Sequence, residues 1–246
     1  MATGKLYIGT SGWHYNHWRG NFYDEKTKAA DFLDFYCRHF KTVEINNSFY
    51  RLPEKKTLAA WHDQTPEGFL FAVKASRFIT HMKKLKDAAG HLENFLDRIE
   101  PLAEKTGPIL FQLPPRWHCN VVRLEDFLSK LPDGYRYTFE FRDESWFADP
   151  VYEALDKVNV AFCLYHLKGW MTPSQVTADF VYVRLHGPGE QAYEGKYETR
   201  DLAGWAGAIS TWRRQGKDVY IYFDNDQSGF APANAMELRD MLEKSQ

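Results

Sequence analysis

The chain has 246 residues, of which 44% are hydrophobic and 26% charged, and these ordinary globular values exclude disorder as its main state. Its formal net charge of −2 at pH 7 excludes an overall basic field of the kind that draws nucleic acid to a whole protein. The length suits one α/β domain covering residues 1–246, since single barrels of this class run to about 250 residues.

The chain carries no sign of export or membrane insertion. No apolar run reaches the ~18 residues that a membrane-spanning helix needs, and the start, MATGKLYIGT, lacks the regions of a signal peptide. Its three cysteines (Cys37, Cys119 and Cys163) form no C-x-x-C pair, which argues against a disulfide framework or a thiolate zinc site. These features predict a cytoplasmic protein without a membrane segment.

Eight short runs rich in β-branched and aromatic residues recur along the chain. Most are nearly continuous apolar stretches, which are typical of strands buried on both faces. In chain order they are KLYIGT (5–10), TVEIN (42–46), FLFAVK (69–74), PILFQL (108–113), RYTFEFR (136–142), VAFCLY (160–165), FVYVRLH (180–186) and DVYIYFD (218–224).

Helical patterns lie between most of these runs, at residues 29–40, 54–64, 91–107, 124–131, 149–158, 199–217 and 233–245. Strands that alternate with helices indicate a parallel sheet, and units of about 30 residues fit a (β/α)8 barrel. The alternative is an open doubly wound sheet, but the chain lacks the glycine-rich nucleotide-binding motifs of that fold. Residues 166–179 show little helical pattern. We therefore predict an α/β, TIM-barrel-like (β/α)8 barrel that is irregular around strands six and seven.

Polar side chains interrupt the apolar runs at or near their C-terminal ends, where a barrel carries its functional face. A buried, unpaired charge costs several kcal/mol, so charges at the ends of five strands favour a site over a purely structural role. The alternative is a self-satisfied ion network, with pairs such as Glu44–Lys74 and Glu140–Arg142. The interrupting residues are Glu44, Asn46, Lys74, Gln112, Glu140, Arg142, Arg184, His186 and Asp224, followed by Asn225 and Asp226.

These residue types predict proton transfer on an anionic ligand. Glu44 and Glu140 suit general acid–base catalysis, and a desolvated Lys74 suits a base or a Schiff-base nucleophile, with a simple paired lysine as the alternative. Arginine side chains bind anionic groups bidentately, and His186 lies beside them. Arg77, Arg142 and Arg184 are the candidates for holding the anion.

Aromatic side chains in the loops predict stacking surfaces for sugars or unstacked bases, with packing of the loops as the alternative. The candidates are Trp13, Tyr15, Tyr50 and Trp146, and the amide groups of Asn46, Gln112 and Asn225 would bind hydroxyls. The sequence has no H-E-x-x-H and no dense His/Asp cluster, so we predict no metal and no cofactor.

Seven motifs, in order and over nearly the whole chain, resemble the YecE-like family, also called domain of unknown function 72. The resemblance implies a TIM-barrel-like fold and no established activity. Two positions depart from the family pattern: Tyr165 and His166 stand where an aspartate tends to end strand six, and Asp224 stands where the family tends to have asparagine. The motifs are TSGWHYNHW (10–18), TVEINNSFYRLP (42–53), FAVKASRFITH (71–81), LFQLPP (110–115), FEFRDESWF (139–147), YVRLHGP (182–188) and YFDNDQSGFAPANA (222–235).

The predicted function is binding or processing of a small anionic, sugar-like ligand at the C-terminal mouth of the barrel, by hydrolysis, isomerisation or lyase chemistry. One alternative is a nucleic-acid-binding or nuclease-like barrel, with nucleic acid as the partner. The other is a ligand-binding protein without catalysis.

Overall fold

The structure is a computed structural model that describes residues 2–244. Its strands are β1 (Leu6–Thr10), β2 (Thr42–Ile45), β3 (Leu70–Lys74), β4 (Thr106–Gln112), β5 (Tyr137–Glu140), β6 (Ala161–Leu167), β7 (Trp170–Met171), β8 (Phe180–Leu185) and β9 (Asp218–Phe223). Its α-helices are α1 (Phe32–Cys37), α2 (Lys55–Gln64), α3 (Ala88–Ile99), α4 (Val121–Leu128), α5 (Asp149–Asp156), α6 (Thr199–Arg214) and α7 (Ala231–Lys244).

The strands follow one another in the sheet in the order β1-β9-β8-β6-β5-β4-β3-β2, with β7 paired to β6. Apart from β7, this is the chain order taken cyclically, and it is the order of a TIM-barrel-like fold. The predicted α/β barrel class is therefore confirmed. The predicted irregularity is confirmed too, because β6 is followed by an antiparallel hairpin with β7 and a loop leading to β8.

The chain divides into two compact units, which we describe separately. Unit 1 comprises Met1–Glu44, Leu164–Thr172 and Asp179–Gln246, and unit 2 comprises Ile45–Cys163 and Pro173–Ala178. Strands β2 and β6 contribute residues to both units. The single domain expected over residues 1–246 stays a prediction.

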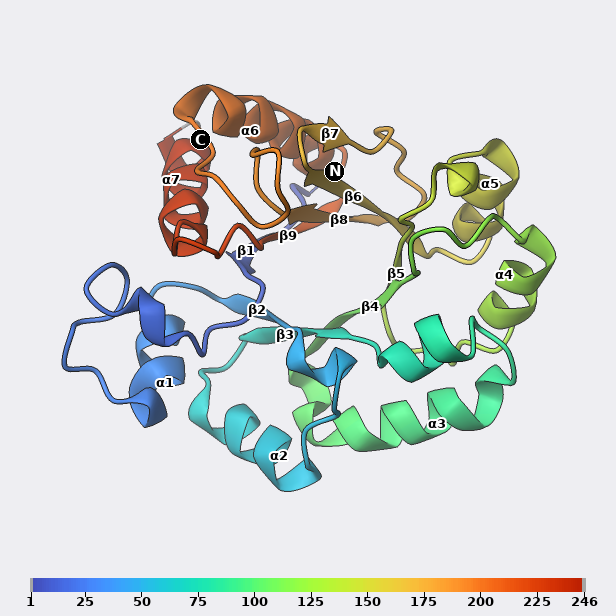
Figure 1. Ribbon diagram of the computed structural model, residues 1–246, viewed down its shortest axis with the longest axis horizontal. Coiled ribbons are helices and arrows are strands. Elements are labelled where there is room, and N and C mark those ends of the chain that lie inside the picture. Colours follow the sequence, from blue (N-terminus) through green and yellow to red (C-terminus); the bar gives the residue numbers. More distant parts are fainter. Residues whose placement is uncertain (1, 245–246) are drawn as a thin grey trace. The chain divides into compact units, whose positions relative to one another are not determined.

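In unit 1, β9 pairs in parallel with both β1 and β8, and the three strands end level with one another, with Phe223 opposite Thr10 and Leu185. Helices α6 and α7 pack together, and both contact β9 (Figure 1). Helix α6 begins with a capping box between Glu198 and Asp201 that satisfies backbone N–H groups of its first turn. This local signal explains why the predicted helical segment begins where it does.

In unit 2, β4 pairs in parallel with β3 and β5, and the apolar core contains stacked rings such as Phe139 and Phe141. The helix predicted over residues 91–107 ends at Ile99 and continues as a 3-10 turn, Glu100–Lys105. Pro101 lacks a backbone N–H and cannot donate the hydrogen bond that would continue the α-helix, so the α-helix ends just before it.

The contact of β1 with β2 in unit 1 depends on one glycine and one tyrosine. A Cβ atom on Gly9 would lie 2.3 Å from the carbonyl oxygen of Thr42, so only glycine allows this close approach. The buried Tyr36 hydroxyl donates to that same Thr42 oxygen at 3.0 Å and accepts from the Thr10 N–H at 3.0 Å. Tyr36 thus links the ends of two strands through backbone groups that no solvent reaches.

We expect Tyr36→Phe to lower the free energy of unfolding by about 1–3 kcal/mol, because it leaves two buried backbone groups without the hydroxyl they bond. Tyr193→Phe is the matched control, since Tyr193 is half exposed in the same unit. Urea denaturation measures both variants. Equal, small losses in the two would contradict the role given to Tyr36.

Candidate functional site

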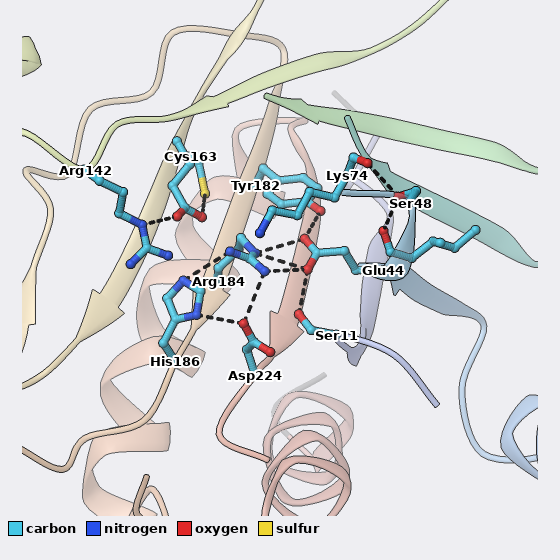
Figure 2. Close-up of polar contacts among 12 residues, drawn as sticks. Ser11, Glu44, Ser48, Lys74, Arg142, Cys163, Tyr182, Arg184, His186 and Asp224 are labelled. Carbon is cyan, nitrogen blue, oxygen red and sulfur yellow. Dashed lines mark hydrogen bonds and ion pairs between the residues drawn. The ribbon is translucent and has the colours of Figure 1, made fainter. Parts of the chain in front are cut away.

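The polar residues at the C-terminal ends of four strands of unit 1 form one connected group. Tyr182, Arg184 and His186 alternate along β8 and its end, so their side chains share one face. The carboxyl ends of parallel strands meet at one edge of a sheet, which brings β1, β2 and β9 residues to the same place. We call Ser11, Glu44, Tyr182, Arg184, His186 and Asp224 the strand-end cluster (Figure 2).

A fully buried ion pair between Glu44 and Arg184 lies at the centre of the strand-end cluster. Arg184 donates from Nε to Glu44 Oε2 at 3.0 Å and from Nη2 to Glu44 Oε1 at 2.7 Å. Ser11 Oγ and Tyr182 Oη each donate to one carboxylate oxygen at 2.6 Å. Such a pair is tolerated out of water only because additional hydrogen bonds satisfy its remaining oxygen lone pairs.

The same guanidinium also orders Asp224 and His186. Arg184 Nη2 donates to Asp224 Oδ2 at 3.2 Å, and Nη1 lies 3.3 Å from His186 Nε2. A guanidinium only donates, so Nε2 accepts and the imidazole carries its proton on Nδ1. His186 Nδ1 therefore donates to Asp224 Oδ2, at 2.9 Å. Asp224 receives two donors on one oxygen and is held in a single orientation.

A second carboxylate, Asp226, lies two residues beyond Asp224 and has a different environment. Trp18 Nε1 donates to its Oδ1, and His17 Nε2 lies 3.1 Å from its Oδ2. Burial raises the pKa of Asp226 to about 6, with the charge of Asp224 adding to the rise and the Trp18 and His17 contacts opposing it. A carboxyl group with this pKa exchanges protons near neutral pH.

The site carries an excess of negative charge. Among the described residues of unit 1, the carboxylates of Glu44, Asp224 and Asp226 lie close together, and Arg184 is the fixed cation paired with Glu44 and Asp224. Burial first, and then the charges of Asp224, Asp226 and Glu44, raise the pKa of the Tyr15 hydroxyl well above its usual range. Hydrogen-bond donors, such as hydroxyl groups, therefore suit this site better than an anion does.

The structure places the other predicted residues of unit 1 around the strand-end cluster. Tyr15 is half-buried and donates to the Ser11 carbonyl oxygen at 2.8 Å. Trp13 is buried, and its ring packs in the core. Asn225 is fully buried, and its Nδ2 donates to Gly195 O and Asn234 Oδ1, both at 2.9 Å. Asn225 therefore links the segment after β9 to the loop at Gly195 and to α7.

In unit 2, two of the predicted residues form an ion pair. Arg142 Nε donates to Glu140 Oε1, and the Cys163 thiol lies 3.8 Å from Glu140 Oε2 (Figure 2). The Glu140–Arg142 pair, one example of the self-satisfied ion network that is the alternative to a site, is thus present. Lys74 lies with its Nζ 4.3 Å from the centre of the Phe49 ring, a cation–π contact.

The remaining predicted residues of unit 2 do not share one environment. Tyr50 and Arg77 are exposed, and Gln112 is half-buried at the end of β4. The amide oxygen of Asn46 is buried without a hydrogen-bond partner among residues 2–244. Trp146 is fully buried and donates from Nε1 to Trp117 O at 2.6 Å, so its ring packs in the core and offers no stacking face.

Sequence reasoning missed three groups that complete the site in unit 1. Ser11 and Tyr182 donate to Glu44, and Trp18 holds Asp226. Only Tyr182 could have been predicted from the sequence, because it precedes Arg184 by two residues on the same strand and so shares its face of the sheet. The others come from distant segments whose contact only the fold creates.

Neither a metal-binding cluster nor a membrane-spanning helix occurs within residues 2–244. Residues 2–244 contain no group of three or more His, Cys, Asp or Glu side chains placed to hold a metal ion. None of the helices within that range has the length and apolar character needed to cross a bilayer.

Sequence comparisons find relatives over nearly the whole chain. The sequence model of the family described as "Protein of unknown function DUF72" matches residues 7–246. The UPF0759 protein YunF of Bacillus subtilis (strain 168) is 26% identical, with 97% of this chain and 95% of YunF aligned. The UPF0759 protein YecE of Escherichia coli (strain K12) is 32% identical over 152 residues, which cover 58% of this chain and 50% of YecE.

Comparisons with solved structures agree. The DUF72 family protein TM1631 of Thermotoga maritima MSB8 matches with a TM-score of 0.88 and 30% sequence identity, over 97% of this chain and 99% of that one. EF0366 of Enterococcus faecalis V583 matches with a TM-score of 0.83 at 19% identity, over 97% of this chain and 95% of that one, which shows likeness of fold.

We expect Glu44→Gln to lower the free energy of unfolding by about 3 kcal/mol, because it leaves the Arg184 charge buried beside a neutral amide. Asp34→Asn is the control, since it breaks an exposed pair with Arg38 and should change stability little. Denaturant unfolding of both variants provides the comparison. A Glu44→Gln protein as stable as the wild type would show that the pair does not hold the strand ends.

Asp226 should titrate with a midpoint near pH 6, visible as a change in tryptophan fluorescence because Trp18 bonds its carboxylate. The folded protein keeps this proton to a higher pH than the unfolded chain does. The Asp226 contribution to stability is therefore present at acidic pH and lost as the pH rises from about 4 through about 6.

Asp226→Asn and Trp18→Phe test that assignment, since each removes one partner. Both should abolish the fluorescence step near pH 6, and Asp226→Asn should also flatten the fall in stability over that range. A step that persists in Asp226→Asn belongs to another group.

Proposed function

Since this chain belongs to the DUF72 family, whose description names no activity, we propose its function from the side chains of unit 1. Unit 1 binds a small, hydroxyl-rich, sugar-like ligand beside the strand-end cluster and exchanges a proton with it through Asp226. The observation that carries this proposal is the pair of neighbouring carboxylates, Asp224 and Asp226, held in different environments. Two carboxyl groups with separate environments are the usual basis for dividing acid and base roles.

Both carboxylates reach solvent, whereas the Asp224 partners Arg184 and His186 are buried, as is Trp18 beside Asp226. The Asp224 and Asp226 side chains are 13% and 14% exposed, whereas Arg184 and His186 are at most 1% exposed. Arg184 and His186 orient Asp224, and Trp18 and His17 orient Asp226. A ligand hydroxyl that reaches the exposed part of either carboxylate can donate to it.

Partly exposed rings lie close to these groups. Tyr193 is 46% exposed and its ring centre lies 5.7 Å from that of His186. Trp170 is 38% exposed, and its ring lies 5.7 Å from Tyr165, which in turn lies 6.0 Å from His186. Aromatic faces beside carboxylates provide the apolar and polar contacts that a sugar ring needs.

The contacts of Arg184 favour a ligand recognised through hydroxyls. Its guanidinium donates to Glu44 and Asp224 and contacts His186, so its hydrogen bonds go to groups of the protein itself. The excess negative charge of this site would repel an anionic group on the ligand. The nucleic-acid alternative, in which arginines would contact phosphates, draws no support from it.

The proposal gives the proton-transfer role to Asp226 instead of Glu44. Glu44 is fully buried with donors on both oxygens, whereas Asp226 is partly exposed and contacts half-exposed His17. His17 links the Asp226 carboxyl to solvent and can restore its proton state after a transfer. The roles predicted for Lys74, Glu140 and Arg142 in unit 2 stay predictions.

A thermal-shift screen tests the proposal with neutral hexoses and pentoses, uronic acids and sugar phosphates at millimolar concentration. We expect a neutral sugar to raise the Tm in proportion to ligand concentration, because ligand binding stabilises the folded state. Asp224→Asn should weaken its affinity by about tenfold or more, which is ~1.4 kcal/mol. Asp34→Asn, an exposed carboxylate of the same unit, should leave the affinity unchanged.

Proton NMR of the bound sugar over time separates binding from processing. Asp226→Asn should keep most of the affinity and lose conversion of the sugar. A sugar that binds and is recovered unchanged from the wild type would select the non-catalytic alternative. Preferential binding of sugar phosphates, or equal effects of Asp224→Asn and Asp34→Asn, would overturn the proposal.

A further inference from the structure

Unit 1 contains a cavity at the opposite end of β1 and β2 from the strand-end cluster. Leu6 is the first residue of β1, and Lys41 directly precedes β2. The cavity has a volume of about 510 Å³, which lies within the range of small-molecule sites. Side chains from β1, α6, α7 and the segment after α1 line it.

The walls of this basal cavity combine an apolar floor with a basic rim. Leu6 and Ile8 alternate on β1 and so face it together, beside buried Phe40 and Leu242. The rim carries four fixed cations and a single carboxylate, that of Glu243. The cations are those of Arg38, Lys41, Arg213 and Arg239.

Two of these cations have a structural explanation. Arg38 and Arg239 lie beside Asp34 and Asp240, and Arg239 Nη1 also donates to the His39 carbonyl oxygen at 2.8 Å. Arg38 and Arg239 therefore need no ligand to account for them.

Lys41 and Arg213 have no acidic partner of this kind, although Arg213 lies in the last turn of α6, where a basic side chain also offsets the helix dipole. Across residues 2–244, no carboxylate lies within ion-pair distance of either side chain. Arg213 uses Nε to donate to the Gly4 carbonyl oxygen at 2.9 Å, which holds its guanidinium beside the cavity. The positive field acts on His39 as well, because after burial the charges of Arg239 and Arg38 lower its pKa.

We propose that the basal cavity binds a small organic phosphate, with the phosphate group between Lys41 and Arg213 and its apolar body on Leu6, Ile8 and Leu242. A guanidinium and an ammonium group together match the double negative charge of a phosphate monoester. The apolar floor distinguishes such a ligand from inorganic phosphate. This site is separate from the strand-end cluster and does not depend on the function proposed there.

Calorimetric titration with phenyl phosphate at low salt tests the proposal. We expect binding that weakens about tenfold or more in the double variant Lys41→Gln/Arg213→Gln and stays within about twofold in Arg214→Gln. Arg214 is the matched control because it follows Arg213 on α6 and does not line the cavity. Glu243→Gln should tighten binding, because it removes the carboxylate of the rim.

Two further measurements guard against a folding artefact. Lys41→Gln alone alters an exposed side chain and should weaken binding about threefold or more on its own. Phenol, which lacks the phosphate, should show no binding at the same concentrations. Absence of phenyl phosphate binding, or an equal loss in Arg214→Gln and Lys41→Gln/Arg213→Gln, overturns the proposal.

Discussion

The buried ion pair of Glu44 with Arg184 is the interaction on which the chemistry of unit 1 depends. Two charges without solvent are stable only with near-complete hydrogen bonding, and Ser11, Tyr182 and Asp224 provide it. Ser11 directly follows β1, Tyr182 lies on β8 two residues before Arg184, and Asp224 directly follows β9. The need to satisfy one buried pair therefore fixes the relative positions of the strand ends and orients Asp224 toward solvent.

The two ends of the same strands differ in charge. Carboxylates outnumber cations beside the C-terminal ends of β1, β2 and β9, whereas cations outnumber carboxylates in the basal cavity beside the starts of β1 and β2. The net charge of −2 does not reveal this separation, because it sums the charges of the whole chain. The two places consequently suit different ligands, one rich in hydroxyl groups and one carrying a phosphate.

Much of the fold was predictable because its signals are local. The apolar strand runs, the helices between them and the unpatterned segment before β8 all follow from periodicity over a few residues. The Glu140–Arg142 pair was predictable from the apolar run 136–142, in which residues two apart share a face, although β5 itself ends at Glu140 and Arg142 lies just beyond it. The helix boundary at Ile99 was missed although its signal, Pro101, was equally local.

The sequence by itself determined the barrel class and the polar residues at the strand ends, because strand periodicity and position along a strand are properties of short segments. Only the tertiary structure decided the partners. Arg184 lies 140 positions from Glu44, and Asp226 lies 208 positions from Trp18. It also placed Trp146 in the core and left Asp224 and Asp226 partly exposed. Burial and long-range pairing arise when distant segments pack together, and no local pattern encodes which segments will meet.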